Sequence, residues 1–201
     1  MLATRPSAAP TGSANGAAGT TGSANGAADP TGAADPTGAA GLAPHRGRSA
    51  WPAWRLLALA TKYSALVKPW AQSSRLPLLE RQYELLERTT NFELWLIHWP
   101  TDGGLVLHDH GGSSGAFHVV WGALDETSTT RRGQALHRQR LVRSEGKSFG
   151  PDYVHSVANS EQTVATSVHA YSPPLTSMNL YQASPGGLVL SRVETDWEGA
   201  P

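Results

Sequence analysis

Hydrophobic and polar positions follow three patterns along the chain. Residues 1–48 contain almost no large apolar side chains, residues 51–67 and 76–88 carry apolar side chains every three or four positions, and residues 92–193 alternate in short runs. A spacing of three or four places apolar side chains on one face of a helix, whereas alternation places them on one face of a strand. The chain is therefore predicted to contain a polar tail, two helices and a series of strands.

The tail consists almost entirely of Ala, Gly, Thr, Ser, Pro, Asn and Asp, and within it the strings TGSANGAA and DPTGAA each occur twice. Such residues bury too little apolar area to offset the entropy lost on ordering. We predict a disordered low-complexity tail over residues 1–48 and one folded domain over residues 49–201, which is an ordinary single-domain size.

The helical segments read WPAWRLLALATKYSALV (51–67) and LPLLERQYELLER (76–88), the second with a proline near its start, where a missing N–H is harmless. The strand-like runs are 92–99, 105–110, 116–121, 124–130, 135–142, 154–158, 163–171, 177–182 and 188–193. The turn signal RRGQ suggests a hairpin between the fourth and fifth runs. Many short strands between turns are typical of a sandwich or small barrel, so we predict a mainly-β barrel with two N-terminal helices.

Composition narrows the classes of function. The formal net charge is zero and no cluster of Lys or Arg stands out, which argues against a nucleic-acid surface. The chain has no cysteine, which excludes disulfides, a cysteine nucleophile and zinc–thiolate clusters. No stretch is long enough to span a membrane and the start lacks the pattern of a secretory signal, so a cytoplasmic protein that does not act at a membrane is expected.

Three histidines form a candidate metal site. His108 and His110 end an apolar run two positions apart, so on a strand both imidazoles point the same way and can reach one ion. Glycines follow and permit a sharp turn beside that ion, and His155 in a later strand-like segment supplies a third ligand. Three imidazoles suit Fe, Zn, Cu or Ni, so the ligand type leaves the ion open. The alternative is that the pair are ordinary core or surface histidines.

A second group lies on one predicted strand. Ser167, His169 and Tyr171 are spaced two apart, so a hydroxyl, an imidazole and a phenol project from the same face and can form a hydrogen-bonded chain. Such a relay fixes the tautomer of the histidine and orients the phenol. The alternative is a strand whose one face is partly polar.

Taken together, these segments resemble the cysteine dioxygenase family of cupins, the thiol dioxygenases. LHDHGG is similar to the first cupin motif of the family, SVHAYSPPL matches its Ser-x-His-x-Tyr-Ser-Pro-Pro signature, and VHSVANS is similar to its third-ligand segment. FELWLIHW resembles the family strand that leads into the metal site. The likeness covers about half of the chain, and the motifs are specific when taken jointly.

The resemblance implies a cupin (jelly-roll) β-barrel and a mononuclear Fe(II) held by His108, His110 and His155. It implies a small-molecule thiol and O2 as partners, with Tyr171 beside the open face of the iron, and a monomer. The reaction implied is oxidation of cysteine to cysteine sulfinic acid by an oxidoreductase of cysteine metabolism. The bond between Ser172 and the following proline is expected to be cis.

The resemblance also implies an arginine that grips the substrate carboxylate. Arg81 is the candidate, with Arg88 as the alternative. Relatives that prefer 3-mercaptopropionate carry a glutamine at that place, and the next residue is Gln82. On a helix these two side chains lie about 100° apart, so only one can face the pocket.

The sequence differs at two points from patterns seen in related cupins. Mammalian-type members cross-link a cysteine after the His-x-His pair to the tyrosine, but Gly115 stands there, which is like bacterial-type members. The loop also offers no glutamate as a fourth ligand, in keeping with a site of three histidines. Other possibilities are a non-catalytic cupin that binds a metal or small molecule, and a zinc hydrolase or isomerase on the same scaffold.

Overall fold

The computed structural model describes residues 50–68, 78–131, 133 and 135–195, so the predicted tail lies outside the described part. These residues form one helix and eleven strands. In chain order they are α1 (Ala53–Ser64), β1 (Gln82–Arg88), β2 (Glu93–Trp99), β3 (Gly104–His108), β4 (Ser114–Trp121), β5 (Ala123–Thr130), β6 (His137–Val142), β7 (Gly146–Phe149), β8 (Tyr153–Ala158), β9 (Ala165–Ser172), β10 (Met178–Ser184) and β11 (Gly187–Glu194). The strands form two antiparallel sheets, in the orders β1-β2-β9-β4-β7 and β11-β10-β3-β8-β5-β6.

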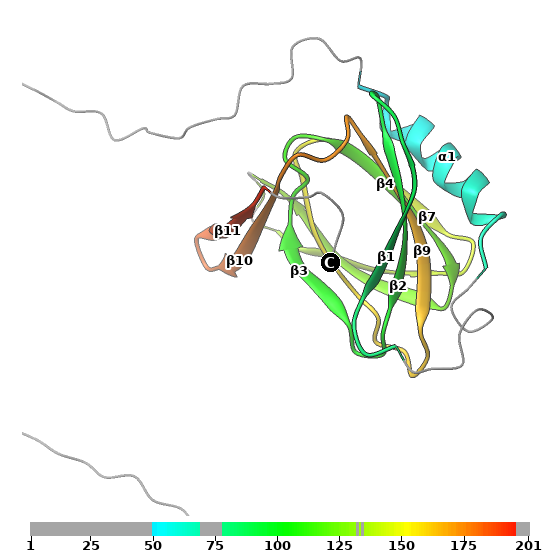
Figure 1. Ribbon diagram of the computed structural model, residues 1–201. Coiled ribbons are helices and arrows are strands. Elements are labelled where there is room, and N and C mark those ends of the chain that lie inside the picture. Colours follow the sequence, from blue (N-terminus) through cyan, green and yellow to red (C-terminus); the bar gives the residue numbers. More distant parts are fainter. Residues whose placement is uncertain (1–49, 69–77, 132, 134, 196–201) are drawn as a thin grey trace, which may run out of the picture. The chain divides into compact units, whose positions relative to one another are not determined.

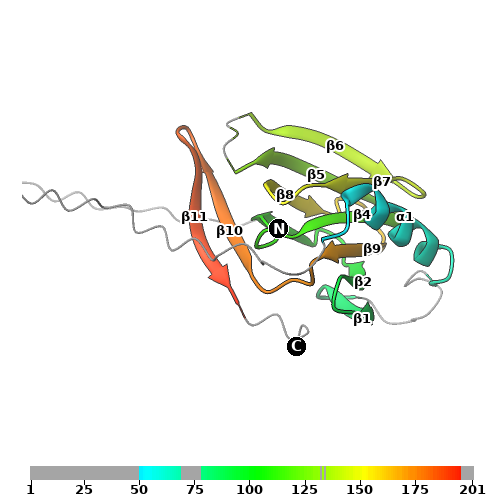
Figure 2. The same cartoon turned by 90° about the horizontal axis from the view of Figure 1, so that it is seen from above.

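The five-stranded sheet is covered on both faces. Figures 1 and 2 show α1 lying along this sheet, on the side away from β10 and β11. Alternate side chains of β2 therefore enter two cores: Leu94 and Leu96 pack with Leu56 of α1, whereas Trp95 and Trp99 pack between the two sheets. Every residue of β2 and β9 is buried for this reason. Polar side chains on the inner face of β9 are thus held in a dry environment.

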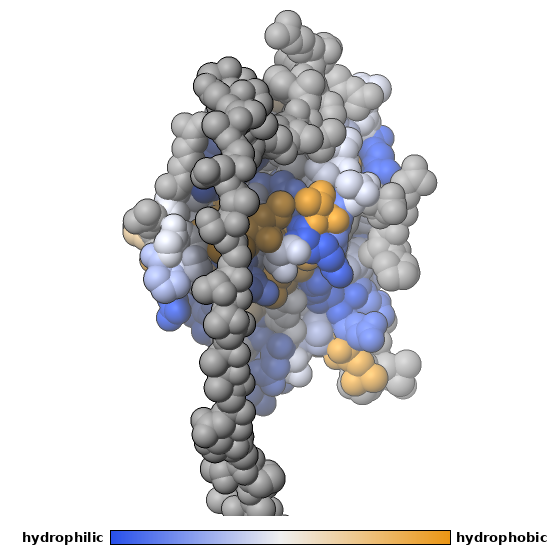
Figure 3. All heavy atoms as spheres, turned by 90° about the vertical axis from the view of Figure 1, so that its left-hand side faces the viewer, coloured by the Kyte–Doolittle hydropathy of each residue, from blue (hydrophilic) through white to orange (hydrophobic). Residues whose placement is uncertain are grey.

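The six-stranded sheet forms the other wall of the barrel. Strands β3 and β8 pair with His108 directly opposite His155, and β5 and β6 form the hairpin predicted around RRGQ. The β10–β11 hairpin extends this sheet at its edge (Figures 1 and 2). Its outer strand exposes Val189, Leu190 and Val193. Figure 3 views the molecule from this side and shows hydrophobic residues standing among hydrophilic ones.

The prediction of a second helix over residues 76–88 is wrong. The described part of this segment contains β1, which pairs antiparallel with β2. Tyr83 packs against the core between the sheets and Leu86 against the core beside α1. Two apolar residues three positions apart therefore lie on opposite faces of an edge strand. The segment is a strand because its pairing with β2 outweighs the helix propensity of Glu, Leu and Arg.

The other predicted elements are present, with ends that differ by a few residues. The first predicted helix is α1, and each of the nine alternating runs is a strand. Strand β7 was not predicted, because its four residues, GKSF, contain a single apolar side chain. Helix α1, the one helix in the described ranges, is too short and too polar to cross a membrane.

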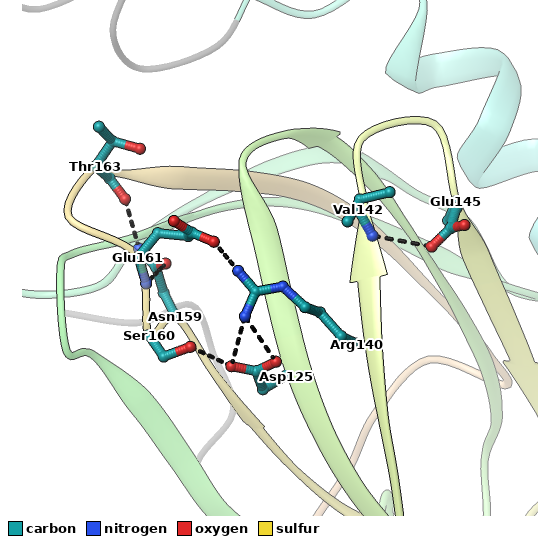
Figure 4. A network of polar contacts seen from close by, with 8 residues as sticks. All are labelled: Asp125, Arg140, Val142, Glu145, Asn159, Ser160, Glu161 and Thr163. Carbon is teal, nitrogen blue, oxygen red and sulfur yellow. Dashed lines mark hydrogen bonds and ion pairs between the residues drawn. The ribbon is translucent and has the colours of Figure 1, made fainter.

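A network of polar contacts joins the turn between β8 and β9 to the β5–β6 hairpin (Figure 4). Arg140 of β6 lies 3.3 Å from the carboxylate of Asp125 on β5 and forms an ion pair with Glu161 in the turn. Ser160 donates a hydrogen bond to the same carboxylate of Asp125. The contacts are exposed to solvent, so each adds little to stability.

Asn159 fixes the same turn from inside the protein. Its side-chain amide is buried and donates to the carbonyl oxygens of Trp99 at 3.2 Å, Pro100 at 3.1 Å and Thr163 at 2.8 Å. One side chain therefore ties the end of β2 to the turn that leads into β9. These are two strands of the five-stranded sheet, and both carry residues of the site described next.

Candidate metal centre and adjoining cavity

Three imidazoles converge on the inner face of the six-stranded sheet. His108 ends β3, His110 follows it by two residues, and His155 lies on β8 directly opposite His108. All three side chains are buried, and one nitrogen of each lies within 4.8 Å of the others. The structure thus brings together the three residues that the sequence analysis selected as ligands.

In each of the three rings, at least one nitrogen is left free by the hydrogen bonds of the described residues. His108 donates from Nδ1 to the carbonyl oxygen of Val106 at 2.7 Å, and His155 donates from Nδ1 to the carboxylate of Glu126 at 2.7 Å. The Nε2 lone pairs of both rings are then available to an ion. Neither nitrogen of His110 has a hydrogen-bond partner in the part of the chain that the structure describes, although both are buried. Unpaired nitrogens in a buried site fit a bound metal, because they would otherwise lose hydration without compensation.

Burial keeps these rings neutral. It lowers the pKa of His108 to about 4, and it lowers the pKa of His110 and of His155 well below the ordinary value. Repulsion between the neighbouring imidazoles acts in the same direction. Neutral imidazole is the form that binds metals, so the site is prepared for an ion at neutral pH.

Aromatic rings hold His110 in place. Its imidazole stacks against Phe149 and against Tyr171, with ring centroids 4.9 Å and 5.0 Å away and ring planes inclined by 26° and 30°. Phe149 also lies against His155 at 5.1 Å. The ligand without hydrogen bonds is therefore oriented by packing, and one of the rings that orients it belongs to the second predicted group.

That group, the relay, consists of Ser167, His169 and Tyr171 on the inner face of β9. Ser167 Oγ lies 2.9 Å from His169 Nε2, and His169 Nδ1 lies 3.1 Å from the Tyr171 hydroxyl. Trp99 of β2 donates from Nε1 to Ser167 Oγ at 2.9 Å. Among the described residues the Ser167 hydroxyl contacts only the Trp99 indole, which can only donate, and His169, so its proton is assigned to His169 Nε2.

The direction of the relay follows. His169 carries its proton on Nδ1 and donates to Tyr171, whose own proton remains free to be donated elsewhere. Burial lowers the pKa of His169 to about 3 and raises the pKa of Tyr171, so both groups stay neutral. The relay therefore presents a protonated phenol of fixed orientation.

A small cavity lies beside the three imidazoles and the relay. Its walls include His108, His155, His169 and Tyr171. The remaining lining residues are Arg81, Tyr83, Ile97, Trp99, Leu105, Val157 and Met178. Most of the wall is therefore apolar, with the polar groups at the metal site, the relay and one arginine.

Arg81 supplies the positive charge of this cavity. Its Nη1 is buried and has no hydrogen-bond partner among the described residues, and its guanidinium lies 5.4 Å from the ring of Tyr83 and 5.6 Å from that of Trp99. The next residue, Gln82, is exposed, because successive side chains alternate along an extended chain. Arg88, at the far end of β1, instead forms an ion pair with Glu93 at 3.0 Å.

The sequence as a whole settles the family. A sequence model described as cysteine dioxygenase type I matches residues 50–184, which is well over half of the chain. The chain belongs to this family.

Several solved structures are similar to this cysteine dioxygenase family member at low sequence identity. The cupin domain of Cnp3 from Schizosaccharomyces pombe is 10% identical, with a TM-score of 0.42 over 49% of this chain and 64% of that one. A cupin superfamily protein from Desulfitobacterium hafniense is 11% identical, with a TM-score of 0.41 over 51% and 86%. KdgF from a Halomonas species is 14% identical, with a TM-score of 0.42 over 51% and 88%. The two antiparallel sheets confirm the prediction of a mainly-β fold, with one helix in the described residues rather than two.

Two further expectations drawn from the cysteine dioxygenase family can be compared with the structure. The bond between Ser172 and Pro173 is cis, as expected. Gly115 pairs with Tyr171 across β4 and β9, and a Cβ atom there would lie 3.0 Å from the Tyr171 ring and 2.4 Å from Phe149. The ring of Phe149 thus occupies space that any side chain at this position would need.

The sequence analysis missed several residues of the site. Trp99 and Tyr83 carry no signal beyond alternation on a strand. Glu126 is fully buried on β5, where Gln139 bonds its carboxylate at 2.6 Å and Lys147 lies 3.3 Å away. A glutamate in an alternating strand is usually exposed, so its role becomes visible only when β5 is seen beside β8.

Proposed function

We propose that the protein is a cysteine dioxygenase, which adds both atoms of O2 to the thiol of cysteine and forms the sulfinic acid. The reaction balances as one thiol plus one O2 giving one sulfinic acid. The observation that carries the proposal is that two histidines of the buried three-histidine site, His108 and His155, line one small cavity together with Arg81, whose Nη1 has no hydrogen-bond partner among the described residues.

Iron is the ion proposed for the site. Ferrous iron held by the three imidazoles would supply the redox chemistry that joins O2 to a thiol sulfur. The donor set fits a divalent ion, because it is neutral and because the buried nitrogens of His110 lack any other partner among the described residues, and membership of the cysteine dioxygenase family favours iron.

Arg81 is proposed to bind the substrate carboxylate. A guanidinium offers several N–H donors in a fixed plane, and the buried Nη1 has none of its hydrogen bonds made within the described residues. A carboxylate would satisfy this donor through a charge-assisted hydrogen bond. Such a contact fixes the direction in which a small thiol points its sulfur, and positioning of this kind lowers the barrier.

Tyr171 is proposed to donate a hydrogen bond to the substrate. The order of donors in the relay leaves the phenol proton free, and Tyr171 lines the cavity. The apolar side chains of Ile97, Leu105 and Val157 help to exclude water from the same space. Exclusion of water strengthens each of these polar contacts.

The placement of Gln82 supports cysteine over 3-mercaptopropionate. Relatives that prefer 3-mercaptopropionate carry a glutamine in place of the carboxylate-binding arginine. In this chain Gln82 is exposed, whereas Arg81 lines the cavity. The two thiols share a carboxylate and differ in the amino group, so both can be offered to the same protein in one experiment.

The test is to supply iron-loaded protein with cysteine or with 3-mercaptopropionate, to record O2 uptake, and to measure the molecular mass of the product by mass spectrometry. We expect uptake with cysteine and a product heavier by two oxygen atoms. Arg81→Ala should raise the KM for cysteine by at least about tenfold at unchanged iron content, because a hydrogen bond between charged groups is lost. Gln82→Ala, a matched change of an exposed neighbour, should leave KM unchanged.

Other results would redirect the assignment. Uptake with 3-mercaptopropionate alone would move the substrate to that thiol. An iron-loaded protein that consumes no O2 with either compound would be a metal-binding cupin without this activity.

A further inference from the structure

A second buried group lies within the His-x-His pair. Asp109 stands between the two ligands His108 and His110, and its side chain is fully buried. A buried carboxylate is costly unless it is hydrogen-bonded and paired with positive charge. The groups that bond to the Asp109 carboxylate therefore indicate the role of this residue.

The carboxylate of Asp109 receives donors from three parts of the chain. Asn179 Nδ2 lies 2.9 Å and 3.1 Å from its two oxygens, and the Tyr181 hydroxyl donates at 2.7 Å. Arg131, at the end of β5, forms an ion pair with it at 3.1 Å. The backbone N–H of Gly111 donates at 2.9 Å and closes the turn that follows the ligands.

The turn at Gly111 has no tolerance for a larger residue. Its φ of +59° lies in the left-handed region, and a Cβ atom there would lie 2.4 Å from Ser177 Oγ. The backbone of the ligand pair is thus pinned on its far side by Gly111 and in its middle by Asp109. The backbone that carries the two ligand side chains therefore cannot shift at this point without breaking bonds made by Asp109.

Two of the donors to Asp109 belong to one strand, β10. The same strand also binds the ligand backbone, because Asp109 N–H donates to the Asn179 carbonyl at 3.0 Å and Leu180 pairs with His108. Strand β10 and its partner β11 form the hairpin at the sheet edge seen in Figures 1 and 2. The end of the ligand strand therefore rests on this hairpin through both backbone and side chains.

We propose that Asp109 is a positioning residue for the metal ligands, and that the β10–β11 hairpin holds it in place through Asn179 and Tyr181. This inference rests on the proposed metal site. The hairpin is then part of the metal centre although it contributes no ligand, and loosening its contacts with Asp109 changes how the ion is held.

The test compares Tyr181→Phe, and the same change combined with Asn179→Ala, with wild type and with Tyr63→Phe. Tyr63 is the matched control, because its hydroxyl also donates to a carboxylate, that of Glu87, but links α1 to β1. For each protein, Co(II) affinity is measured by competition with a chelator, the absorption bands of the Co(II) form are recorded, and Tm is determined.

We expect Tyr181→Phe to weaken Co(II) binding by about 3- to 10-fold and the double variant by about 10- to 100-fold, as is usual when partners of metal ligands are removed. The Co(II) absorption bands should shift in both variants, because the ligand geometry changes. Tyr63→Phe should lower Tm while leaving affinity and spectrum as in wild type.

The inference is overturned if Tyr181→Phe and the double variant bind Co(II) with wild-type affinity and spectrum, whatever happens to Tm. In that case Asp109 and its partners serve stability alone, and the proposed function stands. A wild-type protein that binds no Co(II) would instead overturn the metal site, and with it both proposals.

Discussion

At the scale of single residues, burial determines the chemical state of the side chains in the site. The imidazoles of His108 and His169 are enclosed so completely that their pKa values fall to about 4 and about 3. The direction of the relay depends in turn on one donor, Trp99, which fixes how Ser167 points its proton. Each property belongs to one side chain and can be changed by one substitution.

The first prediction concerns acid stability and His169. The folded protein holds this ring neutral down to about pH 3, whereas the unfolded chain takes up a proton below about pH 6.5. The contribution of His169 to the free energy of unfolding is therefore fully present above pH 6.5 and is lost as the pH falls toward 3. Between pH 7.5 and pH 5 the wild-type protein should lose about 2 kcal/mol through this residue, and His169→Gln should not.

Urea unfolding of both proteins at the two pH values, with a chelator present, measures this difference. The other buried histidines are present in both proteins, and because burial is the main cause of their lowered pKa values, most of their contribution cancels in the comparison. Equal losses of unfolding free energy in wild type and variant would contradict the prediction.

The second prediction concerns Glu126, which receives the Nδ1 proton of His155. Glu126→Gln keeps the shape of the side chain but removes the charge that holds His155 in its orientation and makes its Nε2 a better donor to a metal. Metal affinity should fall by about 10-fold or more. Chelator competition measures the change, and Glu87→Gln, whose carboxylate is bonded to Tyr63, is a control that should bind metal as wild type does.

At the scale of the element, alternation predicted strands correctly, whereas helical spacing predicted α1 correctly and β1 wrongly. The runs that became β2 and β9 were predictable because branched and aromatic residues alternate with others over a full strand length. Strand β1 was misread because Tyr83 and Leu86 stand three apart, a spacing that fits one helix face as well as two strand faces. Only its pairing with β2, a contact between strands, resolves the ambiguity.

The third prediction concerns the turn between β8 and β9. Asn159→Ala removes a buried amide that serves three backbone carbonyls, so carbonyls at the end of β2 lose their donor. The free energy of unfolding should fall by about 2–3 kcal/mol, because buried polar groups are left unsatisfied. Urea denaturation measures it, and Ser160→Ala at the exposed neighbour should change it by less than about 0.5 kcal/mol. Similar effects of the two substitutions would contradict the assigned role of Asn159.

At the scale of the whole molecule, the site is assembled from both sheets. The spacing of His108 and His110, and that of the relay, could be read from the sequence because each group lies within one short segment. The contacts of Glu126 with His155, of Trp99 with Ser167 and of Asp109 with Tyr181 join residues that lie far apart in the chain. No local pattern encodes such contacts, so they became visible only with the strand order.

The fourth prediction concerns removal of the metal. An ion that binds the folded protein but not the unfolded chain stabilises it by about 2.7 kcal/mol when present at a hundred times its Kd. A chelator should therefore lower Tm by roughly 5–10 °C in a domain of this size. Thermal unfolding of wild type and His110→Ala, each with and without chelator, tests it; the variant should show no chelator-dependent shift. An equal shift in both proteins would place the stabilising ion elsewhere.

The bond from Trp99 to Ser167 has one more consequence. An indole N–H cannot take up a proton, and Trp99 is 2% exposed, so the relay stops inside the barrel without an outlet to bulk water. A proton that Tyr171 gives away cannot be replaced through its neighbours on β9. It has to return from the side of the cavity, so the protonation of this phenol depends on what occupies the cavity.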